Sequence, residues 1–307
     1  MTTDEAQAKA PVEPLAGDVP GSSSYAHLHR GHDWGASQVG KITSTQNETI
    51  KDIRKLSRRR RRRTTGLCLV EGIHPVLRAL APDGQAEVQV LVVCPEQLQS
   101  EIARQAVAEA AERGTRVLDV SADVFSSISG RDNPIGIAAV AKPRRWTVED
   151  IPLGENAVLT VLCGTKNPGN LGTIIRTIDA TGGAGAILVG QTTDPFDPTA
   201  IRASMGTVFS VPIARLESAP ELLHYGRSRG ICLVTTSARA ETDLAQARFR
   251  YPCAVLLGSE NEGLPEELLT EGDLQVRIPM RGRASSLNLA VAAGIMLHEA
   301  AKLPNNG

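Results

Sequence analysis

A series of short, continuously apolar runs in the second half of the chain constrains the fold more than any other feature. Segments with helical spacing and turns containing glycine separate these runs. They are AVLTVLCG (157–164), AGAILVG (184–190), FSVPIA (209–214), ICLVTTS (231–237), CAVLLGS (253–259) and VRIPM (276–280). Strands that are apolar on both faces are typical of parallel sheets covered by helices on both sides. The sequence therefore predicts an α/β domain built on a parallel sheet.

A smaller α/β unit precedes this domain. Its expected strands are LCLVEG (67–72), VQVLVVC (88–94), VLDVS (117–121) and IGIAAVA (135–141). Its first expected helix spans residues 42–56, with Ser44 or Thr45 as the cap. The polar segment KPRRWTVEDIPLGEN (142–156) reads as a linker. We therefore expect a disordered tail over 1–40, a first domain over 41–145 and a second over 146–307.

Composition limits the compartment and the partners. A length of 307 residues fits two domains, and a net charge of −1 gives no general affinity for nucleic acid. The five cysteines show no CxxC spacing, and no apolar stretch reaches the roughly 18 residues of a membrane span. Without a signal peptide, the chain is expected in the cytoplasm. A flexible tail explains His27, His29 and His32 better than a metal site, and no metal is expected.

Three loops rich in Gly, Asn, Ser and Glu follow predicted strands. They are NPGNLGTIIRT (167–177), LLGSENEGLP (256–265) and IPMRGRASSLNLAVA (278–292). The first lacks the GxGxxG of a dinucleotide site and the lysine of a P-loop, and taken alone it fits a tight βα turn equally well. Because ligands bind beyond the carboxyl ends of strands in open α/β sheets, the three loops together predict one site.

These three segments resemble the motifs of the SpoU (TrmH-like) branch of the SPOUT superfamily of RNA ribose 2′-O-methyltransferases. The resemblance covers residues 157–303 and implies a parallel sheet with a deep trefoil knot, a homodimer and S-adenosyl-L-methionine as cofactor. The first domain is similar to the substrate-binding domain, related to a ribosomal protein fold, that precedes the catalytic domain in many members. The C-terminal helix, expected over 285–303, is apolar nearly all round, as a helix buried partly against another subunit would be.

The resemblance also assigns the site residues. The expected contacts with the cofactor are Thr236, Gly258, Ile278, Met280 and Leu287. The expected catalytic residues are Arg176, Asn170, Glu260, Ser286 and Asn288. In the family Arg176 is a proposed base, but an arginine stays charged, so gripping a phosphate and stabilising an alkoxide is the alternative. Asn170 would orient Arg176 or the ribose, and Glu260 would hold its turn or pair with a nearby arginine. Ser286 could also cap the last helix.

Basic residues outside the motifs predict how RNA is held. Residues 54–63 carry eight of the 33 basic residues, and the run itself is Arg58, Arg59, Arg60, Arg61, Arg62 and Arg63. We expect this run and Arg202 to contact phosphates, although a solvated basic segment is the simpler reading. Aromatic residues make up only 3%, which favours recognition of structured RNA by shape and phosphates over base stacking.

The leading interpretation is thus a ribosomal (23S) RNA 2′-O-methyltransferase, of a kind that in some members confers antibiotic resistance. A transfer RNA methyltransferase and a non-catalytic RNA-binding protein of the same fold are the alternatives. The missing GxGxxG disfavours a nicotinamide enzyme.

Overall fold

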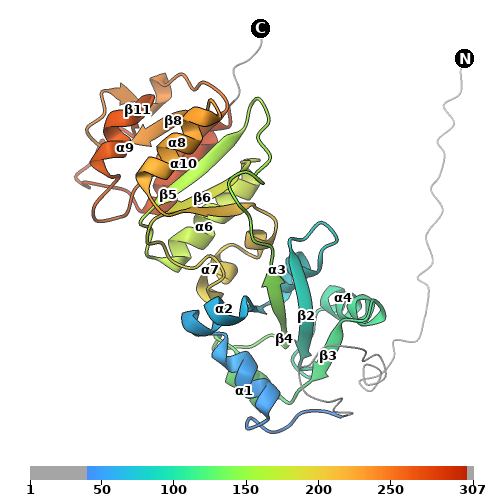
Figure 1. Cartoon of the computed structure of the whole chain (residues 1–307). Helices are drawn as coiled ribbons and strands as arrows, with labels where there is room; N and C mark the ends of the chain where they lie inside the picture. Colours follow the sequence, from blue (N-terminus) through green and yellow to red (C-terminus); the bar gives the residue numbers. More distant parts are fainter. Residues whose placement is uncertain (1–39, 303–307) are drawn as a thin grey trace, which may run out of the picture.

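The computed structural model describes residues 40–302, which form two sheets with helices packed around them (Figure 1). The strands are β1 (Cys68–Glu71), β2 (Ala86–Val93), β3 (Arg116–Asp119), β4 (Ile137–Pro143), β5 (Val158–Cys163), β6 (Gly185–Val189), β7 (Ile213–Leu216), β8 (Cys232–Thr236), β9 (Thr242–Asp243), β10 (Cys253–Leu257) and β11 (Leu274–Arg277). The helices are α1 (Glu48–Lys55), α2 (Arg59–Thr65), α3 (Ile73–Leu80), α4 (Glu101–Glu112), α5 (Ala122–Ile128), α6 (Pro168–Ala180), α7 (Pro198–Ala203), α8 (Ala219–Ser228), α9 (Glu266–Glu271) and α10 (Leu289–Ala300), with short 3₁₀ turns at Thr207–Phe209 and Leu244–Gln246. The tail predicted to be disordered, with its three histidines, lies outside the described residues except for Gly40.

The larger sheet has the strand order β7-β6-β5-β10-β8-β11-β9, and every neighbouring pair is parallel. All residues of β5 and β10 are buried, and alternate side chains enter two different cores. On one face Leu162 packs in the core that includes Ile174 of α6 and Met296 of α10. On the other face Val161 packs in the core that includes Leu223 of α8. The predicted parallel sheet covered on both faces is confirmed.

Local sequence explains why α6 begins where it does. The Asn167 side chain accepts hydrogen bonds from the main-chain N–H groups of Gly169 and Asn170, which the first turn of a helix leaves unpaired. Pro168 occupies the first helical position, where its missing N–H costs nothing. Leu171, Ile174, Ile175 and Ile178 then form the buried face. The strand–turn–helix prediction for this stretch is confirmed.

The smaller sheet has the order β1-β4-β2-β3, with antiparallel and parallel pairs. Its outer core contains α1 and α5, whereas its other face belongs to the same core as α6 and α7 of the larger unit. Figure 1 shows the two units in contact where α2 lies beside α7. The segment 142–156, predicted to be a linker, is mostly exposed but is anchored at two residues: Val148 and Ile151 are buried, and the Tyr225 hydroxyl donates to the Val148 carbonyl over 2.9 Å.

Several predicted boundaries are wrong by a few residues. The cap of α1 is Asn47, which accepts from Ile50 N, and neither Ser44 nor Thr45 caps it. The last helix begins at Leu289 and not at residue 285, because Asn288 caps it. No helix within residues 40–302 is long and apolar enough to cross a membrane. The trefoil knot stays a prediction.

Candidate functional site

Because every strand of the larger sheet is parallel, the carboxyl ends of all its strands lie along one edge. β5, β10, β8 and β11 are consecutive in the sheet, so the loops that follow them are neighbours. These loops carry the three motifs and Thr236. Sheet order therefore brings together segments that are up to about a hundred residues apart in the sequence, as predicted.

A chain of hydrogen bonds ties the three motifs to one another. Asn170 of the first motif donates from Nδ2 to Oε1 of Glu260 in the second, over 2.7 Å. Asn288 of the third motif donates from Nδ2 to Oδ1 of Asn170, over 3.2 Å. The Oδ1 atom of Asn288 also accepts from the N–H groups of Ala290 and Val291, which begin α10. The convergence of the motifs at one site is thereby confirmed.

Arg176 lies outside this chain of bonds. It is exposed on α6, six residues beyond Asn170 and therefore about 9 Å further along the helix axis. Within residues 40–302 its guanidinium has no hydrogen bond or ion pair. The Asn170 amide bonds to Glu260 and Asn288 and makes no hydrogen bond to Arg176 in the described residues, so its orienting role stays a prediction. Arg176 is left free for a ligand.

Gly258 is required by the fold of the second motif. A Cβ at this position would lie 2.0 Å from the carbonyl carbon of Gly263, a distance that no side chain tolerates. The turn from Ser259 to Gly263 folds back on the strand end and is held by the N–H of Glu262 donating to Ser259 Oγ over 3.1 Å. The main chain of the turn thus approaches Gly258 closely, as the cofactor was predicted to do.

The residues expected to contact the cofactor include unusually exposed apolar side chains. Met280 is 39% exposed and Leu287 is 36% exposed, while Ile278 beside them is half-buried. The Thr236 hydroxyl, at the end of β8, donates to the Leu256 carbonyl over 2.9 Å, so its side chain is already satisfied by the protein. Apolar walls next to exposed loop main chain suit an adenine ring, so these residues fit the cofactor that the sequence predicts.

Cys163 ends β5 immediately before the first motif, but its chemistry excludes it as a nucleophile. Burial raises the pKa of the Cys163 thiol to about 12. Because only the thiolate is nucleophilic, this cysteine is inert at neutral pH. Within the described residues, no cluster of histidine, cysteine or carboxylate side chains could hold a metal ion.

Comparison with known proteins identifies the family. The SpoU rRNA Methylase family matches residues 157–298, and the MRM3-like substrate binding domain matches residues 47–139. A 23S rRNA (uridine(2479)-2′-O)-methyltransferase of Streptomyces viridochromogenes is 31% identical over 253 residues, covering 80% of this chain and 86% of that enzyme. The chain belongs to the SpoU family of RNA methylases.

Two further similarities extend over nearly the whole length of the compared proteins. The 23S rRNA (guanosine(2553)-2′-O)-methyltransferase RlmP of Bacillus subtilis is 29% identical, covering 84% of this chain and 98% of that enzyme. The crystal structure of an AdoMet-bound rRNA methyltransferase from Sinorhizobium meliloti is 40% identical with a TM-score of 0.77. It covers 85% of this chain and 97% of that chain. The predicted family and fold class are confirmed.

In this SpoU protein the arginine run divides into different roles. Arg62 is buried: its Nε donates to Asp194 over 2.7 Å and its Nη2 to Asp197 over 2.9 Å. Its Nη1 also donates to the carbonyls of Leu56 and Ser57. The predicted phosphate contact of Arg62 is therefore wrong, because the guanidinium is enclosed by protein acceptors.

The other members of the run are more accessible. Arg59 donates to the Thr192 carbonyl over 3.1 Å, and Arg61 lies 3.9 Å from a carboxylate of Asp52. Arg58, Arg60 and Arg63 are exposed, without ion pairs to the described residues. These three remain the members of the run that are free to bind a phosphate.

One other expected residue has a structural role, one expected helix cap is absent, and three basic residues were missed. Arg202 donates to the Gly130 carbonyl over 3.1 Å and so bridges the two units. Ser286 is exposed in the loop and does not cap α10. The missed residues are Lys166, Arg281 and Arg283, all exposed at the motif edge of the sheet. The letters of the third motif, IPMRGRASSLN, contain two of them and could have indicated an additional anion contact.

Proposed function

We propose that the chain transfers a methyl group to a ribose 2′-hydroxyl of large-subunit (23S) ribosomal RNA. As an RNA 2′-O-methyltransferase of the SpoU family, it uses S-adenosyl-L-methionine as cofactor, whose sulfonium supplies the methyl group. The observation that carries the proposal is the hydrogen-bonded chain Glu260–Asn170–Asn288 at the carboxyl edge of the sheet, with a partner-free Arg176 on the same helix as Asn170. The named 23S rRNA enzymes among its relatives support the choice of RNA.

The residues have distinct proposed roles. Arg176 grips the phosphate beside the target ribose and stabilises the developing alkoxide, since a guanidinium stays charged and is a poor base. Glu260 and Asn288 fix Asn170, so that the first motif keeps its position relative to the cofactor loops. Ser286, exposed beside them, is a contact for the ribose.

The cofactor site is proposed at the loops after β10, β8 and β11. There Ile278, Met280 and Leu287 form apolar walls, while the main chain near Thr236 and Gly258 supplies hydrogen bonds. In the sheet, β10 separates β5 from β8. The catalytic first motif therefore lies on one side of the second motif, and the loops after β8 and β11 lie on the other. This order allows the ribose and the cofactor to meet over the second motif.

We also propose that the protein is a homodimer through its C-terminal domain. Val291 is 52% exposed and Ile295 is 39% exposed, and both lie on one face of α10 because they are four residues apart. An exposed apolar stripe on a helix whose other large apolar side chains are buried suits a second copy. Sedimentation should show a dimer for the wild type and a monomer for Val291→Glu; a monomeric wild type would contradict the proposal.

The proposed division of labour assigns 41–145 to RNA binding and 146–307 to methyl transfer, in a cytoplasmic enzyme. The matched regions, 47–139 and 157–298, lie within these limits. If the methylated nucleotide lies in a drug site of the ribosome, the enzyme would also confer resistance, and a gene-deletion strain would then be more sensitive to that drug.

The direct test maps the product. Total RNA from a strain lacking the gene is incubated with the protein and S-adenosylmethionine carrying a tritiated methyl group, and the labelled nucleotide is located by fragment analysis. A single 2′-O-methylated nucleotide in 23S RNA is expected. Label in transfer RNA alone would support the first alternative, and binding of RNA without any label would support the non-catalytic one.

A further inference from the structure

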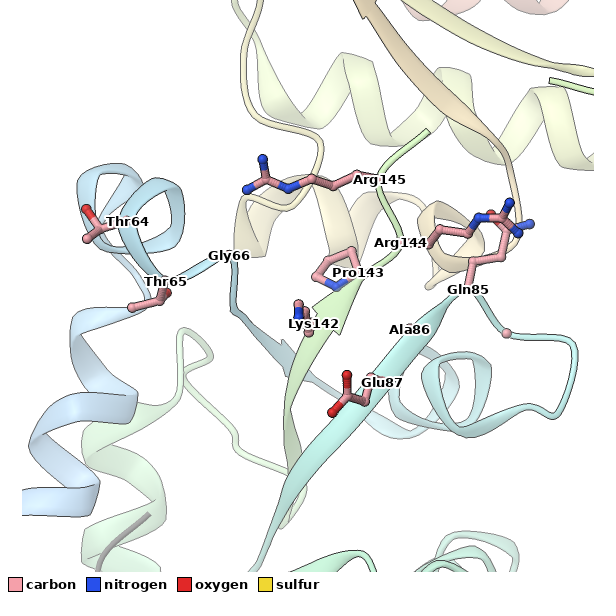
Figure 2. A pocket seen from close by; sticks show the side chains of 11 residues that line it. Thr64, Thr65, Gly66, Gln85, Ala86, Glu87, Lys142, Pro143, Arg144 and Arg145 are labelled. Atoms are coloured by element: carbon pink, nitrogen blue, oxygen red, sulfur yellow. The ribbon is translucent and has the colours of Figure 1, made fainter. Parts of the chain in front are cut away.

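The structure contains a hollow of about 720 Å³ outside the methylation site. Residues 64–66 at the end of α2, 84–87 at the start of β2 and 142–145 at the end of β4 line this α2–β4 hollow (Figure 2). No residue of the three motifs lines it, and its lining residues 64–66 and 84–87 lie within the region that matches the MRM3-like substrate binding domain.

Three of the eleven lining residues are cationic. Lys142, Arg144 and Arg145 are exposed there, and Glu87 is the one carboxylate among the lining residues. None of the three cations forms an ion pair with the part of the chain that the structure describes. Unpaired cations around a concave surface favour an anionic ligand, because each gains a charged partner on binding.

One of the cations is held in position. The Arg144 guanidinium lies over the Trp146 ring, 3.8 Å from its centroid. The main-chain N–H of Arg144 donates to the main-chain carbonyl of Gln85 over 2.6 Å. A methyl group built on Gly66 would lie 3.7 Å from Nη2 of Arg145, so this guanidinium reaches across to the end of α2. Figure 2 shows Arg145 pointing toward α2 and Arg144 pointing toward Gln85. A guanidinium held in advance loses less freedom when it binds.

The two threonine hydroxyl groups in the hollow have no free proton to donate to a ligand. Thr64 Oγ1 donates to the Arg60 carbonyl and Thr65 Oγ1 to the Arg61 carbonyl, each over 2.9 Å. Since these protons are already used, the cations are the groups that would hold an anion. This arrangement suits a phosphate group, which accepts several charged hydrogen bonds and offers no donor.

Helix α2 connects the hollow to the catalytic edge. At its start Arg59 bonds to Thr192 in the loop after β6, and that loop contacts the segment just before the first motif, since Thr193 N donates to the Thr165 carbonyl over 2.8 Å. At its other end Thr65 lines the hollow. Seven helical residues span about 10 Å, and Arg60 and Arg63 are exposed between the two ends. Positive charge therefore continues from the edge of the site to the hollow.

We propose that the α2–β4 hollow is a second subsite for the RNA substrate, which binds a backbone phosphate away from the methylated ribose. This inference rests on the proposed RNA substrate. A polyanion explains the continuity of charge along α2 better than a free phosphate does, because a free ion would need only the hollow. The subsite fixes the position of the RNA and reads no base sequence.

The test compares Lys142→Gln/Arg145→Gln with Arg113→Gln/Arg229→Gln. Both pairs remove two exposed positive charges, but the control pair lies outside the hollow and the motifs. The affinity of each protein for an unmodified 23S RNA transcript is measured over a range of KCl concentrations. Each phosphate contact contributes about 0.7 to 0.9 to the slope of log affinity against log salt. The hollow variant should lose about 0.7 to 0.9 from the slope, as expected for one phosphate contact, while the control keeps the wild-type slope.

Equal slopes in the two variants would overturn the proposal. Chloride is then replaced by inorganic phosphate at constant ionic strength, which separates the two sources of the anion. If phosphate binds the wild type but not the hollow variant, and the two proteins have the same RNA slope, the hollow binds the free ion and the RNA subsite is refuted. Equal melting temperatures and S-adenosylmethionine affinities show that the variants fold. A wild-type protein that binds RNA but methylates none would refute the proposed function, and the salt slopes would still decide the role of the hollow.

Discussion

Replacing Arg62 by methionine tests the buried contact between α2 and the larger sheet unit. The Arg62 side chain is 4% exposed, and Asp194 and Asp197 are 16% and 28% exposed. Removing one partner of a buried ion pair costs about 3 to 5 kcal/mol, because the remaining charges stay desolvated. Water reaches the two carboxylates partly, so we expect about 3 kcal/mol for Arg62→Met.

The assay is thermal unfolding followed by circular dichroism. About 3 kcal/mol corresponds to a fall in melting temperature of roughly 6 to 12 °C for a unit of this size. Arg60→Met is the matched control, since Arg60 is exposed on the same helix and should change the melting temperature little. The triple variant with Asp194→Asn and Asp197→Asn should recover most of the loss, because no uncompensated charge remains. A single variant that melts with the wild type, or a triple variant no better than the single, would refute this reasoning.

Three further predictions concern the site and the core. Arg176→Ala should lower kcat by about 10²- to 10³-fold, as loss of one charge-stabilising donor does, with unchanged S-adenosylmethionine affinity in calorimetry; a full rate would contradict its role. Burial raises the pKa of the Cys163 and Cys253 thiols to about 12, so neither should react with Ellman's reagent at pH 8 in the folded protein. Rapid labelling at pH 8 would be inconsistent with their burial. Because these thiols ionise near pH 9 when unfolded, their contribution to the free energy of unfolding is present below that pH and is lost as the pH rises toward 12. Urea unfolding at pH 8 and at pH 10 can measure this loss. Gly258→Ala should displace the turn, whose main-chain carbon a Cβ would meet at 2.0 Å, and weaken cofactor binding, whereas Gly154→Ala, in open space, should do neither.

The sequence by itself determined the larger sheet and the start of its first motif helix. Runs such as 157–164 and 253–259 are apolar at nearly every position, with Thr160 and Ser259 as the polar exceptions, and this pattern is typical of strands buried on both faces. The start of α6 follows from Asn167 and Pro168, because capping depends on groups two or three residues apart. The meeting of three motifs at one edge also followed from the sequence, since carboxyl ends of parallel strands share an edge.

Which of several similar residues takes a given role was decided only by the tertiary structure. Ser286 and Asn288 can both cap a helix. In the structure Asn288 is the cap of α10, and its side chain also donates to Asn170 on the neighbouring helix α6. Likewise segment 142–156 has the polar composition of a linker, yet its few apolar residues are buried because the larger unit offers them a surface.

The arginine run shows the same division most clearly. Six identical side chains give local sequence no means of distinguishing Arg62 from Arg60. Asp194 and Asp197 lie more than 130 residues further along the chain and select Arg62, because the docking of α2 onto the loop after β6 brings only that guanidinium between both carboxylates. Sequence determined that this segment is basic. The long-range packing of two units decided which of its charges form buried ion pairs and which stay exposed and free for a ligand.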